Sequence, residues 1–510
     1  MNTTRRTGII DIGSNSIRLV VYEITSDLAY RVIDEGKATA RLSDKISHDG
    51  RLEAGYVHEI IDILQYFQKL CASHWASTVR TVATAAIRTA SNRAEIVRQL
   101  EEATNLRIEV LSGEEEARAG FLGMINSLDI EDGFLVDIGG GSTEVSLFLG
   151  RRLVRSISLP FGAVNTAKRF TRNGAVTDAD VVRIRQMIIK ALEDQTWMRS
   201  HAGLPLIGLG GTIRSVCKIH QRKHHYSLPL AHNYAIGGDE MNRLLESLAA
   251  MPMDKRKKVD GLSGDRADLI VPGMIILTTI FLLTEASHYR ISGSGLRDGL
   301  FFETIFPERS MLDDVLEHSV RNMLHLQPYL NIAHVEQVDR LALRLFDSVQ
   351  IAFSLPPCYR VYLHVAALLY RMGIHVHYYD YRIHTFYMLA HSRIGGLSHR
   401  EILICALIAS YKTKNRMRHL AAPYGDLLIE ADLESIVRLG MLLNAAIALD
   451  RSETQPVAAL STDLHKNELA LRCQFRHHAD IEIREFQEIR KDFKKAWKLD
   501  IRLNYEWISM

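Results

Sequence analysis

The segment DIGGGSTE, residues 137–144, places a carboxylate at each end of a run of three glycines, a serine and a threonine. Each glycine loses much backbone freedom on folding, so the run destabilises a strand unless the bare backbone is needed there. Successive glycines let backbone N–H groups converge on an anion without obstruction by side chains. Asp137 would then approach a metal ion that bridges to phosphate oxygens, since hard cations take oxygen ligands. The segment predicts a phosphate-binding loop; the alternative is a tight hairpin whose glycines only supply positive φ.

The same pattern occurs twice in the chain, which favours the phosphate-binding interpretation. Residues 8–23, GIIDIGSNSIRLVVYE, and residues 134–149, FLVDIGGGSTEVSLFL, each predict a strand, a tight turn and a second strand. Asp11 aligns with Asp137 in this internal repeat. A third glycine hairpin is predicted in residues 206–216, LIGLGGTIRSV.

Two other phosphate-binding motifs are excluded by the sequence. No GxxxxGK[ST] run is present, and the glycines of a dinucleotide fingerprint open a helix, whereas GGGSTE is followed by the strand-like VSLFL. A glycine hairpin between two strands is similar to the arrangement in the actin, Hsp70 and sugar-kinase superfamily. This resemblance implies an α/β fold of two similar, ribonuclease H-like lobes, with phosphate and metal held in the cleft between them.

A second segment whose residues could take part in catalysis is LSGEEEARAGFLG, residues 111–123. Ser112 with Glu115 predicts a capping box, and glutamates in a first helical turn suit the helix dipole. Glu116 is less needed for capping and lies on a different helix face from Glu115. A carboxylate beside a phosphate cleft can orient and deprotonate a water, which contributes roughly 10²–10⁴-fold. Glu116 is therefore a candidate general base, with a purely helix-stabilising role as the alternative.

The order of several motifs resembles that of the exopolyphosphatase and guanosine pentaphosphate phosphatase (Ppx/GppA) family. The motifs are IDIGSNS, ATAAIR with Asn92 after it, SGEEEAR, VDIGGGSTE and GLGGTI, followed by GLSGDRADLIVPG and ISGSGLRDGL. Together they cover residues 8–305. The resemblance implies a hydrolase that uses Mg²⁺ to remove terminal phosphate from inorganic polyphosphate.

The resemblance also implies roles for individual residues. Glu116 falls on the catalytic base, and Arg88 falls on an arginine near the reacting phosphate, where a guanidinium suits bidentate pairing; the alternative for Arg88 is a helix-surface position. The carboxylates that fall on metal-associated positions are Asp11, Asp137 and Glu144. The phosphate-binding positions are Ser14, Asn15, Ser16, Gly139, Gly140, Gly141, Ser142, Gly210, Gly211 and Thr212. The expected metal is Mg²⁺ or Mn²⁺, since both favour oxygen ligands.

The composition is typical of a soluble globular protein, because 47% of the 510 residues are hydrophobic and 24% are charged. A net charge of +2 argues against a dedicated nucleic-acid binder. Five separated cysteines without CxxC spacing favour a reduced, cytoplasmic setting. The longest uncharged run, residues 269–284, is shorter than the ~18–20 apolar residues of a membrane span. It predicts a buried helix, and with no targeting segment visible we expect no membrane insertion.

Changes of pattern along the chain predict four domains. Helical stretches alternate with strands in the first 305 residues, long amphipathic stretches follow, and short strand-like pieces then surround a charged helix. Helices of the first lobe are expected over residues 54–74, 93–104 and 114–128. The expected domains are two lobes at 1–127 and 128–305, an all-α domain at 306–456 and a small α/β unit at 457–510.

The all-α domain contains six histidines between residues 364 and 399. Long members of the resembled family carry a domain there that is similar to the HD metal phosphohydrolases, and His384 falls on one of the HD histidines. Tyr370-Arg371 stands where the defining His-Asp dyad is expected, and arginine cannot ligate a divalent cation. The resemblance therefore implies a degenerate HD-like domain without its own metal, which extends the substrate channel or supports a homodimer. The alternative is a rearranged site that uses His375 and His377.

Several functions remain open from the sequence alone. The leading prediction is an exopolyphosphatase, and a guanosine pentaphosphate 5′-phosphohydrolase shares every motif quoted. A superfamily kinase is disfavoured by SGEEEAR, and a non-catalytic alarmone or nucleotide sensor is disfavoured because the carboxylates are intact. Two basic segments, residues 220–225 (HQRKHH) and 254–258 (DKRKK), are candidate walls of a cationic substrate path, with plain solvated surface as the alternative.

Overall fold

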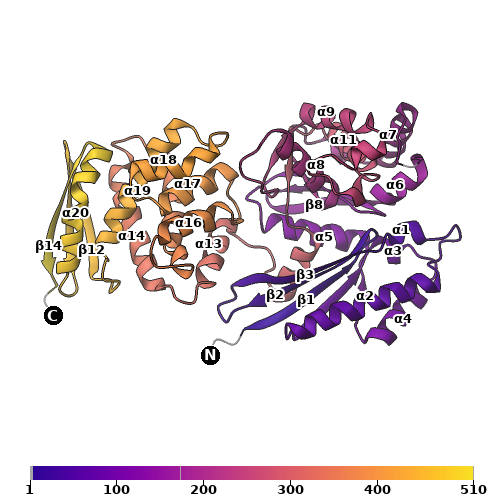
Figure 1. The fold of residues 1–510 in the computed structure, drawn as a ribbon, viewed down its shortest axis with the longest axis horizontal. Coiled ribbons are helices and arrows are strands. Elements are labelled where there is room, and N and C mark those ends of the chain that lie inside the picture. Colours follow the sequence, from indigo (N-terminus) through magenta and orange to yellow (C-terminus); the bar gives the residue numbers. More distant parts are fainter. Residues whose placement is uncertain (1–3, 173, 509–510) are drawn as a thin grey trace. The chain divides into compact units, whose positions relative to one another are not determined.

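The computed structural model describes residues 4–172 and 174–508 (Figure 1). These residues form two compact units, one that extends to Val315 and one that begins at Leu316. The first unit contains two α/β lobes, and the second contains a helical region followed by a small sheet.

The first lobe is built on a five-stranded sheet with the order β3-β2-β1-β4-β5. Strand β1 pairs antiparallel with β2, β2 pairs antiparallel with β3, and β4 and β5 continue the sheet in parallel. The strands are β1 (Arg5–Ile12), β2 (Ser16–Ile24), β3 (Tyr30–Thr39), β4 (Thr78–Ala83) and β5 (Ile108–Val110).

The second lobe repeats this topology. Its sheet has the order β10-β11-β9-β6-β7-β8, so β6 has the place of β1, β7 and β8 form the antiparallel side, and β9 and β11 form the parallel side. Strand β10 is an antiparallel addition at the edge. The strands are β6 (Gly133–Ile138), β7 (Thr143–Leu149), β8 (Arg152–Leu159), β9 (Leu206–Leu209), β10 (Ala235–Gly237) and β11 (His288–Ile291). Two sheets of the same order confirm the predicted pair of actin-like lobes.

The helices of the two lobes follow the apolar periodicity of the sequence. Helix α2 buries residues at helical spacing, Val57, Ile60, Leu64, Phe67 and Cys71, against the first sheet. Helix α11 is buried almost all round, as its uncharged sequence predicts. The α-helices among the described residues of the two lobes are α1 (Leu42–Lys45), α2 (Ala54–Ser73), α3 (Ala85–Arg88), α4 (Arg93–Thr104), α5 (Gly113–Ile125), α6 (Ala163–Phe170), α7 (Asp178–Leu192), α8 (Gly210–Lys223), α9 (Gly238–Ala249), α10 (Met253–Arg256), α11 (Ile270–Leu283) and α12 (Leu296–Ile305).

Helices α5 and α12 connect the cores of the two lobes. Leu300, Phe301 and Phe302 of α12 join a buried cluster with residues of β1, β2 and β4, and Phe301 stacks on Tyr22 with ring centroids 4.0 Å apart. Phe121 on the other side of α5 packs with residues of the second sheet. The two lobes are therefore joined by shared apolar packing as well as by the chain, which fixes the position of any residue carried by α5.

The second unit begins with helices and ends with a three-stranded sheet. Its helices are α13 (Val315–His325), α14 (Ile332–Gln350), α15 (Cys358–Leu369), α16 (Tyr381–Ala390), α17 (His399–Ala409), α18 (Lys414–Ala421), α19 (Glu430–Ala448) and α20 (Asp480–Trp497). Its strands are β12 (Val457–His465), β13 (Glu468–Phe475) and β14 (Asp500–Trp507). Helix α20 packs along this sheet (Figure 1). The predicted order of an all-α region and a small α/β unit is confirmed, whereas its likeness to HD domains stays a prediction. No helix within the described residues has both the length and the apolar character needed to span a membrane.

Candidate active site

The two glycine hairpins meet at the edge where β1 and β6 end. The first loop joins β1 to β2 and the second joins β6 to β7, as the sequence predicts. A pocket in the first unit lies between these loops and the N-terminus of α8. The predicted site residues that line the pocket are Asp11, Ser14, Asn15, Ser16, Glu116, Asp137, Gly139, Gly140, Ser142, Gly210, Gly211 and Thr212. Three predicted residues, Arg88, Gly141 and Glu144, are not among the residues that line the pocket.

The glycines at 139–141 are needed because the two hairpins approach each other closely. A β-carbon on Gly140 would lie 3.0 Å from Cβ of Ser14 and 3.1 Å from the backbone nitrogen of Asn15. One on Gly141 would lie 2.8 Å from the Ser14 hydroxyl. Neither glycine has positive φ, so the alternative of a hairpin that merely uses glycine's conformational freedom is wrong. The bare backbone allows both lobes to present N–H groups to one pocket.

The third glycine segment forms a different local structure from the predicted one. Strand β9 ends at Leu209 and helix α8 begins at Gly210, so residues 206–216 form a strand-to-helix turn and the predicted hairpin is wrong. Gly210 has φ +81°, and a β-carbon there would lie 2.7 Å from Oδ1 of Asp137. Gly211 and Thr212 begin the helix and line the pocket. The free N–H groups and positive dipole end of α8 therefore favour an anion at this position.

Asp11 and Asp137 are two half-buried carboxylates in the pocket lining. They occupy equivalent positions near the ends of β1 and β6, and Oδ1 of Asp11 is buried without a hydrogen-bond partner among the described residues. Burial raises the pKa of Asp11 and raises that of Asp137 to about 6. An orphaned buried oxygen and a second carboxylate nearby fit a hard divalent cation such as Mg²⁺, which binds through one or two carboxylates and retains waters.

Glu116, Arg88 and Glu144 form a chain of charged groups behind the pocket. Nη1 of Arg88 donates to Oε2 of Glu116 at 2.7 Å and to the carbonyl of Leu111 at 2.9 Å. Nη2 of Arg88 lies 4.0 Å from Oε1 of Glu144, which accepts a hydrogen bond from Ser158 at 2.8 Å. Arg88 is thus mostly buried and is not a helix-surface arginine, and Glu144 has protein partners that Asp11 lacks.

Burial also controls the protonation of these glutamates. Burial, with smaller contributions from Asp137 and Asp11, raises the pKa of Glu116 to about 7 although the Arg88 hydrogen bond opposes this. The pKa of Glu144 is raised by burial and by the nearby charge of Glu116. Glu116 is carried by α5, whose N-terminus is fixed by the predicted capping box of Ser112 and Glu115. A carboxylate with a pKa near 7 that faces a phosphate pocket is well matched to general-base chemistry at neutral pH.

Four arginines that the sequence patterns did not single out line the pocket. They are Arg18, Arg214, Arg266 and Arg297. Burial and, to a smaller extent, the neighbouring arginines together lower the pKa of Arg18 to about 10. Burial likewise lowers the pKa of Arg214 and Arg266. Mutual repulsion of this kind is relieved when a polyanion binds, so the four guanidinium groups define an oligoanion site.

The two basic segments proposed as walls of a substrate path do not line this pocket. Arg256, at the centre of residues 254–258, is 1% exposed. Its guanidinium donates to the backbone carbonyls of Leu248, Gly174, Ala267 and Met251. Arg256 therefore organises the surrounding loops, and the cationic walls of the pocket come from dispersed arginines.

The helical unit places its polar residues in hydrogen-bonded networks. His334 of α14 is 1% exposed, and its two ring nitrogens pair with Asp450 at 2.8 Å and with the hydroxyl of Tyr370. Arg371 forms an ion pair with Glu453. Sequence reasoning noticed Tyr370 and Arg371 but missed His334, which reaches them only through the fold.

His364 of this unit also has partners other than a metal. Nδ1 of His364 pairs with Asp339 and Nε2 pairs with Glu317, each at 2.9 Å. Although burial lowers the pKa of His364, these two carboxylates outweigh it and raise the pKa overall. His375 and His377 belong to no set of three metal-ligating side chains within the part of the chain that the structure describes. Neither does His384 of α16.

Comparison with known proteins agrees with this architecture. The sequence model of the Ppx/GppA phosphatase family matches residues 20–306, and that of Ppx/GppA phosphatase domain III matches residues 315–488. A solved Ppx/GppA family member from Aquifex aeolicus is 28% identical, with a TM-score of 0.53, and the match covers 60% of this chain and 99% of that one. A solved exopolyphosphatase from Cytophaga hutchinsonii shares the fold at 22% identity with a TM-score of 0.55, covering 60% of this chain and 100% of that one.

Proposed function

The chain belongs to the Ppx/GppA phosphatase family and is a phosphoanhydride hydrolase, and from this premise we propose that it removes terminal phosphate from inorganic polyphosphate. The observation that carries the proposal is the pocket lining. Four arginines converge on it, and none of the described residues that line it is aromatic. Proteins that hold a nucleic-acid base commonly stack it on an aromatic ring. A pocket rich in guanidinium groups and without such a ring therefore favours a substrate that consists of phosphates alone.

Glu116 is proposed to take the proton of the attacking water. Its pKa of about 7 means that a large share of the group is ionised at neutral pH, and it lies against the same pocket as the glycine loops. Arg88 is a positioning residue in this scheme, because its Nη1 donates to Glu116 and holds the carboxylate in place. The proton that Glu116 accepts then leaves through solvent when phosphate is released.

The polyphosphate chain would be held by the backbone and by the arginines. Residues of the two hairpin loops and of the α8 N-terminus line the pocket, where backbone N–H groups not used within the loops would donate to the terminal phosphoryl oxygens. Arg18, Arg214, Arg266 and Arg297 would bind further phosphates of the chain. Mg²⁺ held by Asp11 and Asp137, with Glu144 nearby, would supply positive charge against the phosphate oxygens.

The proposal is tested by measuring phosphate release with Mg²⁺ from long-chain polyphosphate and from guanosine pentaphosphate, side by side. Glu116→Gln removes the proposed base, and Glu115→Gln is the matched control because Glu115 only caps α5. We expect faster release from polyphosphate, a loss of roughly 10²–10⁴-fold in kcat for Glu116→Gln, and near-normal rates for Glu115→Gln. Preference for the pentaphosphate would instead assign the enzyme to alarmone hydrolysis. Full activity of Glu116→Gln would remove Glu116 from the role of base.

A further inference from the structure

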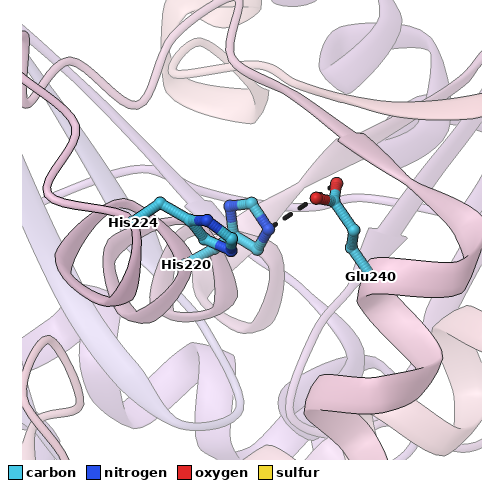
Figure 2. Close-up of side chains that lie close together, drawn as sticks. All are labelled: His220, His224 and Glu240. Carbon is cyan, nitrogen blue, oxygen red and sulfur yellow. Dashed lines mark ion pairs between the residues drawn. The ribbon is translucent and has the colours of Figure 1, made fainter. Parts of the chain in front are cut away.

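Two histidines and a glutamate meet at the end of α8 that lies away from the phosphate pocket. His220 and His224 are one helical turn apart on and just after α8, and Glu240 lies in the first turn of α9 (Figure 2). Each offers one ligand atom, and these three atoms lie within 4.8 Å of one another. Among the residues that the structure describes, no other set of three His, Cys, Asp or Glu side chains meets this condition.

The buried histidine of this group has an unsatisfied nitrogen. His220 is 6% exposed, and its Nδ1 lies 2.9 Å from the hydroxyl of Tyr234. Its Nε2 is buried without a hydrogen-bond partner and lies 3.7 Å from Oε2 of Glu240 (Figure 2). When Nδ1–H donates to Tyr234, the Nε2 lone pair faces a carboxylate oxygen, and two acceptors then oppose each other. A cation between them satisfies the orphaned Nε2, since an unpaired buried polar group is costly, while Oε2 of Glu240 can keep its hydrogen bond from the backbone N–H of Gly237.

The other neutral tautomer of His220, in which Tyr234 donates to Nδ1 and Nε2–H points toward Glu240, leaves Nε2 unsatisfied as well, because 3.7 Å is too long for a hydrogen bond. The ring of His224 lies beside that of His220, with centroids 4.2 Å apart. His224 is also the C-cap of α8, where unpaired carbonyls and the negative end of the helix dipole favour a positive ion.

We propose that His220, His224 and Glu240 bind a divalent transition-metal ion, for which Zn²⁺ is the best match. Two imidazoles and one carboxylate are the donors that Zn²⁺ prefers, and solvent water would complete four-coordination. Mg²⁺ is a poor candidate because it prefers oxygen donors throughout. Tyr234, by accepting from Nδ1–H, fixes the ring orientation that a ligating histidine needs.

The proposed ion is distinct from the one expected in the phosphate pocket. The pocket is lined by Gly210, Gly211 and Thr212 at the start of α8, whereas His220 and His224 lie at its end. A helix of 14 residues is roughly 20 Å long, so the two positions do not overlap. The ion would tie the end of α8 to the start of α9 and so stabilise the helix that presents its N-terminus to the pocket.

The test measures Zn²⁺ binding by the full chain in excess Mg²⁺, with a chromogenic chelator as competitor. His224→Asn removes one exposed ligand, and His225→Asn is the matched control, because Asn tolerates the φ of +50° at that position. We expect the wild type and His225→Asn to bind Zn²⁺ equally, and His224→Asn to bind it at least ~10-fold more weakly. Equal binding by all three proteins would overturn the proposal.

A second variant and the absorption spectrum of bound Co²⁺ test whether the metal is held by these three residues. Glu240→Gln retains an oxygen that can accept from the backbone of Gly237, so α9 keeps its cap while the charged ligand is lost. Co²⁺ in place of Zn²⁺ should give a visible absorption band typical of four-coordination in the wild type, weakened in both His224→Asn and Glu240→Gln. A band unchanged in both variants would place the ion elsewhere. Phosphate release with Mg²⁺ should stay unchanged in these variants, since neither residue lines the phosphate pocket.

Discussion

The phosphate pocket of the first unit and the His334 network of the helical unit use similar residue types and differ in how their buried polar atoms are paired. In the pocket, Oδ1 of Asp11 has no hydrogen-bond partner among the described residues, and burial raises the pKa of Asp137 to about 6. In the network, both nitrogens of His334 are hydrogen-bonded, and Oδ1 of Asp450 accepts from the backbone of Gln455 at 2.8 Å. Unsatisfied buried groups in the first region require a ligand, whereas the second region is complete without one.

The comparison shows why residue type alone does not identify a metal site. Histidines and aspartates are metal ligands only if their lone pairs face a common point and lack protein partners. Tyr370 and Asp450 occupy both nitrogens of His334, and Arg371 and Glu453 neutralise each other. Buried polar groups that are fully hydrogen-bonded stabilise a structure, whereas buried polar groups without a partner indicate a site that binds a ligand or an ion.

The largest effect should follow from neutralising a pocket carboxylate. Asp137→Asn keeps the shape of the side chain and removes the charge that would hold Mg²⁺, so phosphate release should fall by at least ~10²-fold. Thermal stability of the first unit should be retained or should rise, because a desolvated charge is removed. Initial rates and a thermal melt measure the two effects on the same sample. Loss of stability together with activity would show that Asp137 has a structural role, and the pocket would then not differ from the His334 network in this respect.

In the helical unit, neutralising a buried carboxylate should instead lower the stability. In Asp450→Asn, an NH₂ group turned to the backbone N–H of Gln455 leaves two donors facing each other in a buried site. An NH₂ group turned to Nδ1 of His334 forces the other tautomer of the ring, so that the Tyr370 hydroxyl loses its acceptor. The helical unit should lose about 3 kcal/mol of unfolding free energy. Hydrogen exchange of peptides from α14 and α19 would report this loss locally. Unchanged protection in both helices would show that the network does not stabilise the unit.

The fold could be predicted where short-range patterns determine it. Alternating apolar residues around Asp11 and Asp137 predict the two hairpins, and the spacing of Val57, Ile60 and Leu64 predicts α2. The error at residues 206–216 arose because adjacent glycines favour a hairpin and a strand-to-helix turn equally. The apolar spacing of Ile213, Val216, Cys217 and His220 after them does carry the helical period.

The site could be predicted only in part, because some of its members meet only after folding. The carboxylates and glycines stand in compact motifs, so their types and spacing were informative. The pocket arginines are single residues at 18, 214, 266 and 297, and His334 is 36 residues from Tyr370 and 116 from Asp450. A run of basic residues does not by itself indicate a substrate path, because the buried guanidinium of Arg256 in one such run donates to backbone carbonyls.

In the pocket, a smaller effect is expected from a change of pH. The folded-state pKa values of Glu116 and Asp137, about 7 and about 6, lie above those of the unfolded chain, near 4.5 and 3.8. The folded state therefore holds protons more tightly, so the unfolding free energy of the first unit should fall as pH rises from about 4 to about 7. Mg²⁺ binds the ionised forms and should raise the thermal midpoint more at pH 8 than at pH 5. Asp137→Asn should weaken this difference, and an equal response at both pH values would contradict it.

The smallest effect is expected from the histidines that sequence reasoning proposed as a rearranged metal site. His375 stacks on Tyr329 with ring centroids 6.0 Å apart, and Nδ1 of His377 lies 3.3 Å from the carbonyl of Tyr379. Asp380, the nearest carboxylate in the chain, is paired with Arg416 at 2.9 Å. The double variant His375→Ala, His377→Ala should therefore bind as much Zn²⁺ as the wild type and keep its unfolding free energy within about 0.5 kcal/mol. If the double variant instead lost one equivalent of bound Zn²⁺ while His224→Asn kept it, the metal site would lie in the helical unit and would use His375 and His377.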